Sequence, residues 1–304
     1  MSLNCREDSP AHGCFLEAPF NYNEARYVII GVPYDSTSSW GVGSRFGPSA
    51  IIEASRYMDP YDIELDCIPL ESGIHTMPEL SVMGIAPTRM IDAVYSKVAC
   101  VLSDGKVPVI LGGEHTVSLG AIKAAREFGV EYLVVLDAHA DFYDEYEGER
   151  FSHATVTMRA SEIVSRTLVM GVRTIGWEEK KLLSDREDVR VLYRESLRDQ
   201  AISEIKKEVK GRKIYLSVDV DVLDPCYVPC VSTPEPDGLS WRELTHILRE
   251  IIHSSEVIAM DFVEFSPCHG MRSDSYSIAR LVYKAIGYHA TNPRNGNFGY
   301  NSNE

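Results

Sequence analysis

One stretch of the chain carries three polar residues at alternating positions, directly after an apolar run. Leu133-Val-Val-Leu136 is followed by Asp137, His139 and Asp141. In an extended segment, residues at this spacing project to one side of the chain. Two carboxylates and an imidazole at the end of a buried strand are costly to remove from water without a partner. A metal ion is the simplest partner, and a solvated loop with a capping aspartate is the alternative.

Polar side chains follow three further apolar segments, at the point where each segment ends. They are His115, the pair Asp219 and Asp221, and Glu264. In parallel α/β sheets, ligands bind outside the carboxyl ends of the strands. A single histidine after Gly-Gly, or a single Asp-x-Asp, is more often a loop or turn feature. Their joint occurrence after apolar segments favours one shared site.

The donor set suits two divalent ions better than one. It contains four carboxylates and two imidazoles, from Asp137, Asp141, Asp219, Asp221, His115 and His139. These ligands exceed the four of a tetrahedral zinc site and suit two ions that share bridging carboxylates. Ligation rich in carboxylate and free of thiolate favours Mn²⁺ over Zn²⁺. Two such ions lower the pKa of a shared water, so that hydroxide is available near neutral pH.

Alternating strands and helices must position these side chains. Apolar segments predict strands at 27–33, 107–111, 133–136, 168–172, 189–193, 213–218 and 257–260. One helix is predicted to begin at about Pro48, and another to follow Thr116 and end at about Phe128. Further helices are predicted at 87–103, 155–165, 196–210, 241–252 and 274–288. Residues 59–86, rich in Pro, Gly and Asp, are expected to be irregular. The alternation predicts one α/β domain with a parallel sheet of about eight strands, covered on both faces.

The composition is that of an ordinary globular protein and restricts the classes of partner. The chain has 304 residues, 44% of them hydrophobic, and a net charge of −15. This acidity argues against a nucleic-acid surface and suits cationic small molecules or metal ions, although most of it is explained by solubility. No apolar run reaches the length of a membrane span, and Met1 to Pro10 lack the apolar region of a signal peptide.

The cysteines predict a reduced, cytoplasmic protein. There are seven, widely scattered and without a Cys-x-x-Cys pair. Cys226 and Cys230 are four residues apart, and they would form a soft-metal site with Cys268 and His269 only if the fold brought them together. Ordinary free thiols are the expectation, and the sequence assigns no role to them.

Several motifs together resemble those of the ureohydrolase family of arginases and agmatinases. In chain order they are Gly112-Gly-Glu-His115, Asp137-Ala-His-Ala-Asp141, Ser152-His153, Ser217-Val-Asp-Val-Asp-Val-Leu-Asp-Pro225, Thr233-Pro-Glu-Pro236 and Val263-Glu-Phe-Ser-Pro267. The resemblance covers roughly 27–289. It implies a three-layer α/β/α arginase-like fold for a single domain 1–304, with 290–304 as a polar tail. It also implies a homo-oligomer, a trimer or a hexamer.

The resemblance implies a binuclear Mn²⁺ centre with two ions per chain. One ion would be held by His115, Asp137, Asp141 and Asp219, and the other by His139, Asp137, Asp219 and Asp221. Asp137 and Asp219 would then bridge the two ions.

The same resemblance implies hydrolysis of a guanidino group to urea and an amine. The bridging hydroxide would attack the guanidinium carbon, and Asp141 would handle the proton of this nucleophile. His153 would contact the substrate and assist protonation of the leaving amine. Glu264 would pair with the planar guanidinium and orient it.

Agmatine, hydrolysed to putrescine and urea, is the substrate that the motifs favour. The agmatinase-like features are Ser152-His153, Thr233–Pro236, and Gly171-Val-Arg173 followed by Glu178-Glu179. The acidic run Asp144–Glu149 is a candidate to attract a second positive charge, with a solvated loop as the alternative. Arginase, guanidinobutyrase, aminopropylagmatine ureohydrolase and formimino-amide hydrolase activities remain open. Outside this class, the alternatives are a catalytically silent structural or regulatory member and an unrelated two-metal phosphoesterase.

The sequence departs from the family pattern beside the expected pocket. Cys230-Val-Ser-Thr233 stands where Gly-Thr-Gly-Thr is usual, Cys268-His-Gly follows Ser-Pro, and Asp237 replaces a common glycine. None of these positions is an expected metal ligand. The departures therefore leave the chemistry in place and the identity of the substrate open.

Overall fold

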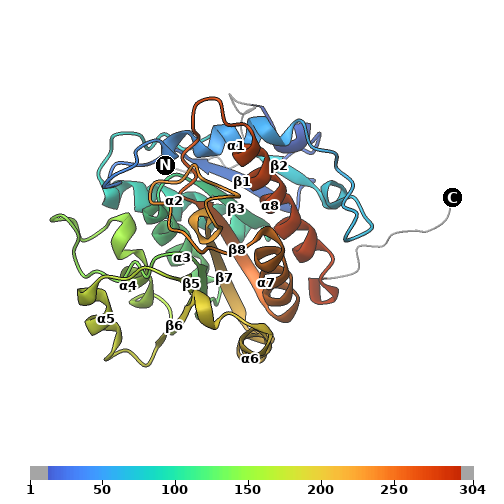
Figure 1. Cartoon of the computed structure of the whole chain (residues 1–304). Coiled ribbons are helices and arrows are strands. Elements are labelled where there is room, and N and C mark those ends of the chain that lie inside the picture. Colours follow the sequence, from blue (N-terminus) through green and yellow to red (C-terminus); the bar gives the residue numbers. More distant parts are fainter. Residues whose placement is uncertain (1–12, 296–304) are drawn as a thin grey trace.

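The apolar segments form the strands of one parallel sheet in the computed structural model, which describes residues 13–295 (Figure 1). The strands are β1 (Tyr27–Val32), β2 (Ile74–Thr76), β3 (Val107–Gly112), β4 (Tyr132–Leu136), β5 (Arg166–Val172), β6 (Val189–Tyr193), β7 (Lys213–Asp219) and β8 (Glu256–Val263). Their order is β2-β1-β3-β8-β7-β4-β5-β6, and every neighbouring pair is parallel. The predicted parallel sheet is confirmed.

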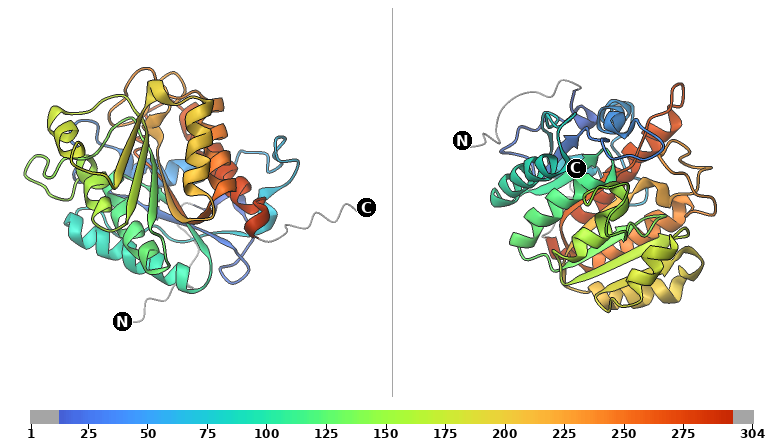
Figure 2. Two further views of the ribbon diagram at one scale, coloured as in Figure 1. Left: turned by 90° about the horizontal axis from the view of Figure 1, so that it is seen from below. Right: turned by 90° about the vertical axis from the view of Figure 1, so that its left-hand side faces the viewer.

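Helices cover both faces of this sheet (Figure 2). They are α1 (Gly47–Ser55), α2 (Pro87–Ser103), α3 (Ser118–Glu127), α4 (Val156–Ser161), α5 (Trp177–Leu183), α6 (Asp199–Val209), α7 (Trp241–Ser254) and α8 (Ser273–Ala290). One layer contains α2, α3 and α4, which contact one another in chain order. The other contains α1, α8, α7 and α6, again in contact one after the next. The three-layer α/β/α architecture is therefore confirmed.

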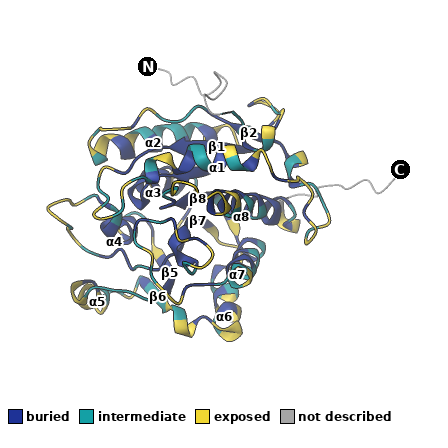
Figure 3. Ribbon diagram, turned by 45° about the horizontal axis from the view of Figure 1, so that its top comes forward, coloured by how far each residue is buried: buried dark blue, intermediate teal, exposed yellow. Residues whose placement is uncertain are grey.

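Alternate residues along each strand serve the two layers. In β1, Tyr27 and Ile29 belong to the hydrophobic cluster of α1, α7 and α8, whereas Val28 and Ile30 belong to that of α2 and α3. Successive side chains of a strand point to opposite faces of the sheet. Because both faces are buried here, the strands are continuous apolar runs in the sequence. Figure 3 shows the buried strands at the centre and the exposed residues on the outer helix faces and loops.

Two short elements differ from the sequence-based prediction. Strand β2 lies inside 59–86, which was expected to be irregular, and pairs with β1 at the edge of the sheet. Helix α5 was not predicted. The predicted helix 155–165 is shorter, since α4 ends at Ser161. Three-residue strands and seven-residue helices are too short to display a periodic pattern, so tertiary contacts decide their structure.

Local capping explains where helix α7 begins. At the start of α7, Ser240 Oγ accepts a hydrogen bond from Glu243 N at 3.3 Å, and the Glu243 carboxylate accepts one from Ser240 N at 2.8 Å. This reciprocal pair satisfies two backbone donors that have no partner within the helix. The predicted start at Trp241 is therefore correct, while the helix runs two residues beyond the predicted end.

Some predictions fall outside the described chain. The polar segment Met1 to Pro10 and residues 296–304 of the expected tail lie beyond residues 13–295. Between residues 13 and 295, no helix has both the length and the apolar character that a membrane span requires.

Candidate metal centre and active site

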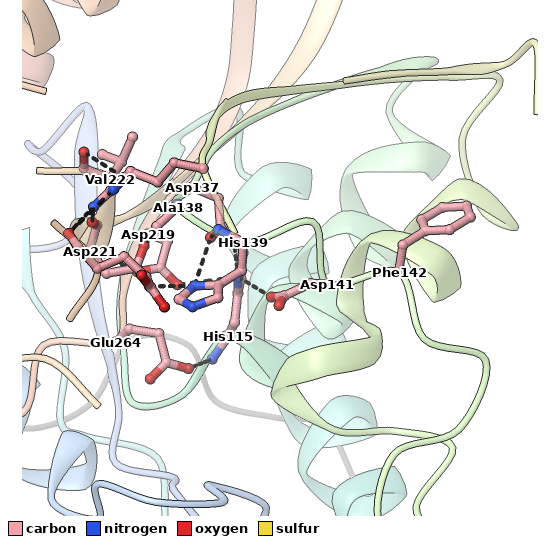
Figure 4. Close-up of polar contacts among 12 residues, drawn as sticks. His115, Asp137, Ala138, His139, Asp141, Phe142, Asp219, Asp221, Val222 and Glu264 are labelled. Carbon is pink, nitrogen blue, oxygen red and sulfur yellow. Dashed lines mark hydrogen bonds and ion pairs between the residues drawn. The ribbon is translucent and has the colours of Figure 1, made fainter. Parts of the chain in front are cut away.

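The polar residues predicted to form one site converge at the carboxyl edge of the sheet (Figure 4). His115 follows β3, Asp137 follows β4, Asp219 ends β7, and Glu264 follows β8. These four strands are consecutive at the centre of the sheet. Because parallel strands end at the same edge, their terminal residues face one shared space. The sheet order thus explains why residues that are up to 149 positions apart meet.

Three carboxylates surround one nitrogen of His115. Its Nδ1 lies 3.1 Å from Asp141 Oδ2, 3.1 Å from Asp137 Oδ2 and 3.5 Å from Asp219 Oδ2. All four residues are buried. His115, Asp137 and Asp141 form a group whose ligand atoms are close enough to hold a metal ion. Asp219 lies beside this group.

A second group forms around His139. Its Nδ1 lies 2.8 Å from Asp221 Oδ2 and 3.6 Å from Asp137 Oδ1. Asp137, His139 and Asp221 are also close enough to hold an ion. Asp137 belongs to both groups, with Oδ2 on the side of His115 and Oδ1 on the side of His139. This is the arrangement that a bridging carboxylate requires.

Short backbone contacts hold these carboxylates in place. Asp137 Oδ1 accepts a hydrogen bond from His139 N at 2.6 Å, and Asp219 Oδ1 accepts one from Asp221 N at 2.9 Å. Asp221 Oδ1 accepts one from Ala138 N at 3.0 Å, which ties the two turns together. In an Asp-x-Asp or Asp-x-His turn, the first aspartate satisfies the amide two residues later. The sequence spacing therefore orients these side chains as well as placing them.

The chemistry of this cluster fits divalent cations. Burial, together with the negative charge of Asp137, raises the pKa of Asp141 to about 7. Burial and the charge of Asp221 raise the pKa of Asp219. Asp137 Oδ2 is buried and receives no hydrogen bond within the described chain. Buried carboxylates that repel one another need a cation, and oxygen and imidazole donors without thiolate suit Mn²⁺-like ions.

His153 lies on the wall of the cavity beside these groups. Its Nε2 lies 3.3 Å from Ser39 Oγ, and its ring packs edge-on against Tyr146 with centroids 5.7 Å apart. Nδ1 is buried and has no hydrogen-bond partner among the residues described. Burial lowers the pKa of His153, so the neutral imidazole predominates near pH 7.

Glu264 follows β8 and lines the same cavity. One carboxylate oxygen accepts a hydrogen bond from His115 N at 2.6 Å (Figure 4). Burial raises the pKa of Glu264 to about 8, with a further contribution from the charge of Glu114. Its φ of 66° lies in the left-handed region, as does the 49° of Asp141. Non-glycine residues in this region are enriched at functional sites, where surrounding contacts hold them.

The cavity has a volume of about 190 Å³ and includes wall residues that the sequence analysis missed. Besides the residues singled out in the sequence, among them Glu179, it is lined by Ser39, Tyr143, Tyr146, Thr174 and Ile175. Within the acidic run 144–149, only Tyr146 lies on this wall. Glu145 and Glu147 are exposed outside it, and Asp144 pairs with Arg159. The part of the run nearest a substrate is therefore aromatic.

Glu114 also has a structural role that its motif did not reveal. Its buried carboxylate accepts hydrogen bonds from the backbone amide and hydroxyl of Thr37 and from the Ser38 hydroxyl, at 2.7–3.1 Å. These bonds hold the Ser/Thr-rich segment in which Ser39 lies, and so place Ser39 beside His153. A carboxylate next to a predicted metal ligand thus orders the cavity wall.

The structure corrects the expectation of free thiols at two cysteines. Cys230 and Cys268 form a disulfide, with Cα atoms 5.5 Å apart. The loop that contains Cys230 and the loop that contains Cys268 are also joined by a hydrogen bond from Ser266 N to Cys230 O at 3.0 Å. One loop carries Thr233 and the other carries Glu264, and both residues line the cavity. No soft-metal site forms there among the described residues, because both sulfurs are bonded to each other.

Comparisons with known proteins agree with this geometry. The model of the arginase family matches residues 25–287. An N(1)-aminopropylagmatine ureohydrolase from Thermus thermophilus is 37% identical over 281 residues, covering 90% of this chain and 93% of the relative. An agmatinase from Halalkalibacterium halodurans is 33% identical, covering 84% and 89%. The crystal structure of agmatine ureohydrolase of Thermoplasma volcanium superposes with a TM-score of 0.80, at 32% identity over 95% of each chain.

Proposed function

The chain belongs to the arginase family, and from this premise we propose that it hydrolyses the guanidino group of an agmatine-type amine to urea and the corresponding amine. One observation carries the proposal. Two groups of carboxylates and imidazoles, which could each hold a metal ion, share the buried Asp137 and lie beside a cavity that Glu264 also lines. A catalytically silent member would have no need to keep the buried charge of this set.

We assign two Mn²⁺ ions to the cluster, which stays carboxylate-rich and free of thiolate. His115, Asp137, Asp141 and Asp219 would hold one ion, and His139, Asp137, Asp219 and Asp221 the other. The distances around His115 and His139 support this division. When bound, a pair of divalent ions lowers the pKa of a shared water and so supplies hydroxide near neutral pH.

Glu264 binds and orients the guanidinium. A carboxylate and a guanidinium form parallel charge-assisted hydrogen bonds in a shared plane. The bond from His115 N holds Glu264 against the metal groups, at 2.6 Å. The substrate carbon is thereby presented to the edge of the cluster, which lowers the entropic cost of reaching the transition state.

Asp141 and His153 handle the protons. Water becomes the carbonyl oxygen of urea, so the attacking oxygen gives up both of its protons, and the leaving nitrogen gains two and departs as a protonated amine. Asp141, which lines the same cavity, can take up the first proton. His153 can deliver the second to the departing amine, since it lines the same cavity and its Nδ1 has no other partner within residues 13–295. The products are urea and a protonated amine.

Two substrates with cationic tails remain candidates. Agmatine follows from the motifs, and N(1)-aminopropylagmatine is favoured by the relatives of that name, which are 34% and 37% identical. The faces of Tyr143 and Tyr146, with ring centroids 5.3 Å apart, offer both tails an attractive surface for a positive charge. The same ring faces do not attract the α-carboxylate of arginine.

The proposal includes the organisation of the protein. Family membership supports a single domain and a homo-oligomer, as a trimer or a hexamer. Light scattering on the purified protein measures this mass directly.

A panel of guanidino compounds tests the proposed substrate class. The Mn²⁺-loaded protein is incubated with agmatine, N(1)-aminopropylagmatine, arginine and 4-guanidinobutyrate, and both urea and amine are measured. We expect kcat/KM for one of the first two to exceed that for the two carboxylates by about tenfold or more, which is about 1.4 kcal/mol of discrimination. A preference for a carboxylate substrate, or no urea from any compound, would overturn the proposal.

A further inference from the structure

A buried chain of hydrogen bonds leads from His115 away from the metal groups. His115 Nε2 lies 3.0 Å from Ser217 Oγ, and Ser217 Oγ donates to Asp261 Oδ1 at 2.6 Å. The Tyr215 hydroxyl donates to the other oxygen, Asp261 Oδ2, at 2.6 Å. All four residues have no exposed surface. The chain therefore lies wholly inside the sheet.

The position of Asp261 is unusual for a carboxylate. It lies within β8, opposite Ser217 of the neighbouring strand β7, in the middle of a parallel sheet. Burying a carboxylate there costs several kcal/mol unless hydrogen bonds and a charge compensate it. Burial raises the pKa of Asp261, and the hydrogen bonds from Ser217 and Tyr215 compensate the carboxylate. The carboxylate is thus linked to the imidazole through Ser217.

The direction of the chain follows from what each group can do. An ionised carboxylate only accepts hydrogen bonds, so the single proton of the Ser217 hydroxyl is used on Asp261. Ser217 Oγ is then left as an acceptor for His115, which makes Nε2 the protonated nitrogen. In a neutral imidazole the other nitrogen, Nδ1, must carry the free lone pair. Nδ1 is the atom that faces Asp137, Asp141 and Asp219.

We propose that Asp261 is a positioning residue for metal binding, which acts through Ser217 to keep His115 in the tautomer whose Nδ1 can bind an ion. The inference rests on the proposed function only in requiring a metal ion at the His115 group. Partners that accept the outer N–H of a ligating histidine fix its ring and tautomer and raise its basicity. Here a serine hydroxyl relays that effect from the carboxylate.

The relay serves one of the two groups. His139 has no comparable partner, since its side chain is 24% exposed and its Nε2 makes no hydrogen bond within the described chain. Loss of the relay should therefore weaken binding of the ion at His115 and leave the ion at His139 in place. A general loss of structure would affect both ions.

Three variants separate these cases. Ser217→Ala removes the relay and leaves a cavity of one oxygen atom. Asp261→Asn keeps the shape, but its amide can donate to Ser217 Oγ and so reverse the chain, which favours a proton on Nδ1. Tyr215→Phe is the matched control, because it removes a hydrogen bond of the same carboxylate without touching the relay.

The readout is metal affinity, which does not depend on catalysis. Metal-free protein is equilibrated with Mn²⁺ at buffered free concentrations, and bound Mn²⁺ per chain is measured together with thermal unfolding. We expect Ser217→Ala and Asp261→Asn to weaken one of two binding steps by about 10- to 100-fold, with the other step and both steps of Tyr215→Phe unchanged. The double variant Ser217→Ala, Asp261→Asn should bind Mn²⁺ in the affected step as weakly as the more affected of the two single variants.

Other results overturn the inference. If both Mn²⁺-binding steps of Ser217→Ala and Asp261→Asn are unchanged, or both are equally weakened, Asp261 has only a structural role. The same conclusion follows if Tyr215→Phe loses as much affinity as these two variants. If Asp261→Asn does not fold, Ser217→Ala decides the question alone. Wild-type protein that binds no Mn²⁺ would instead contradict the proposed metal centre, so the two failures are distinct.

Discussion

Asp137 Oδ2 lies 3.1 Å from His115 Nδ1, although the strands that these residues follow, β4 and β3, are separated in the sheet by β7 and β8. Oδ1 of the same aspartate lies 3.6 Å from His139 Nδ1. One carboxylate therefore joins the two candidate metal groups, and the proposed two-ion chemistry depends on it.

Replacement of His153 should affect the reaction more than binding. In His153→Gln we expect kcat to fall by about 100-fold or more, because positioned proton transfer contributes on this order. Bound Mn²⁺ should change little, since His153 lies outside both metal groups. Steady-state urea release and metal analysis measure these quantities. Ser39→Ala, which removes only the partner of Nε2, should cause a smaller loss. An increase in KM at unchanged kcat would show that His153 only binds.

The Cys230–Cys268 disulfide should stabilise the fold and the cavity. Its half-cystines are 38 positions apart, and a loop of this size corresponds to about 4 kcal/mol in the chain-entropy model. We expect the double variant Cys230→Ser, Cys268→Ser to lose up to that amount in denaturant unfolding and to show a higher KM, because the loops that carry Thr233 and Glu264 are no longer tied. Cys226→Ser, at an exposed free thiol, is the control. Free thiols at both positions without reductant would contradict the bond.

The free energy of unfolding should decrease as the pH falls, because His289 is buried in its neutral form. This residue is 3% exposed, and burial, followed by the charge of Arg26, lowers its pKa to about 4 from its ordinary value of 6.5. The unfolded chain thus takes up a proton near pH 6.5 and the folded chain only near pH 4, so the contribution of His289 is complete above 6.5 and declines below it. The total loss is about 3 kcal/mol.

A difference between variants isolates this effect from other titrating groups. Unfolding free energies of the wild type and His289→Gln are compared from pH 7 to 4, with the exposed His269→Gln as control. The wild type should lose about 3 kcal/mol more than His289→Gln over this range. Parallel pH curves for the wild type and His289→Gln would show that His289 is not held neutral.

The fold could be predicted largely because the strands are buried on both faces. Continuous apolar runs mark β3, β4, β7 and β8, and the residues directly after them form the site. Edge strand β2 and helix α5 have three and seven residues, so their structure depends on neighbours that the sequence does not reveal. At Asp237, where the resemblance expects glycine, φ is 62°. The departure therefore keeps a left-handed turn that aspartate tolerates.

The site was predictable in its ligands and less so in its supports. Asp and His residues at strand ends carry a visible pattern, whereas Asp261 is hidden inside an apolar strand, and only pairing with β7 reveals its partners. Tyr146 was obscured by the acidic residues around it. The pairing of Cys230 with Cys268 depends on two loops that meet only in the folded chain.

Stepwise restoration of metal tests the central claim most directly. Metal-free protein is titrated with Mn²⁺ while urea release is followed from agmatine or N(1)-aminopropylagmatine, whichever is the better substrate. We predict no urea without metal, an increase that ends at two equivalents per chain, and no increase at any concentration for Asp137→Asn, because this variant weakens the carboxylate shared by both groups. Full activity without metal, saturation at one equivalent, or no urea at any Mn²⁺ concentration would contradict a two-ion ureohydrolase.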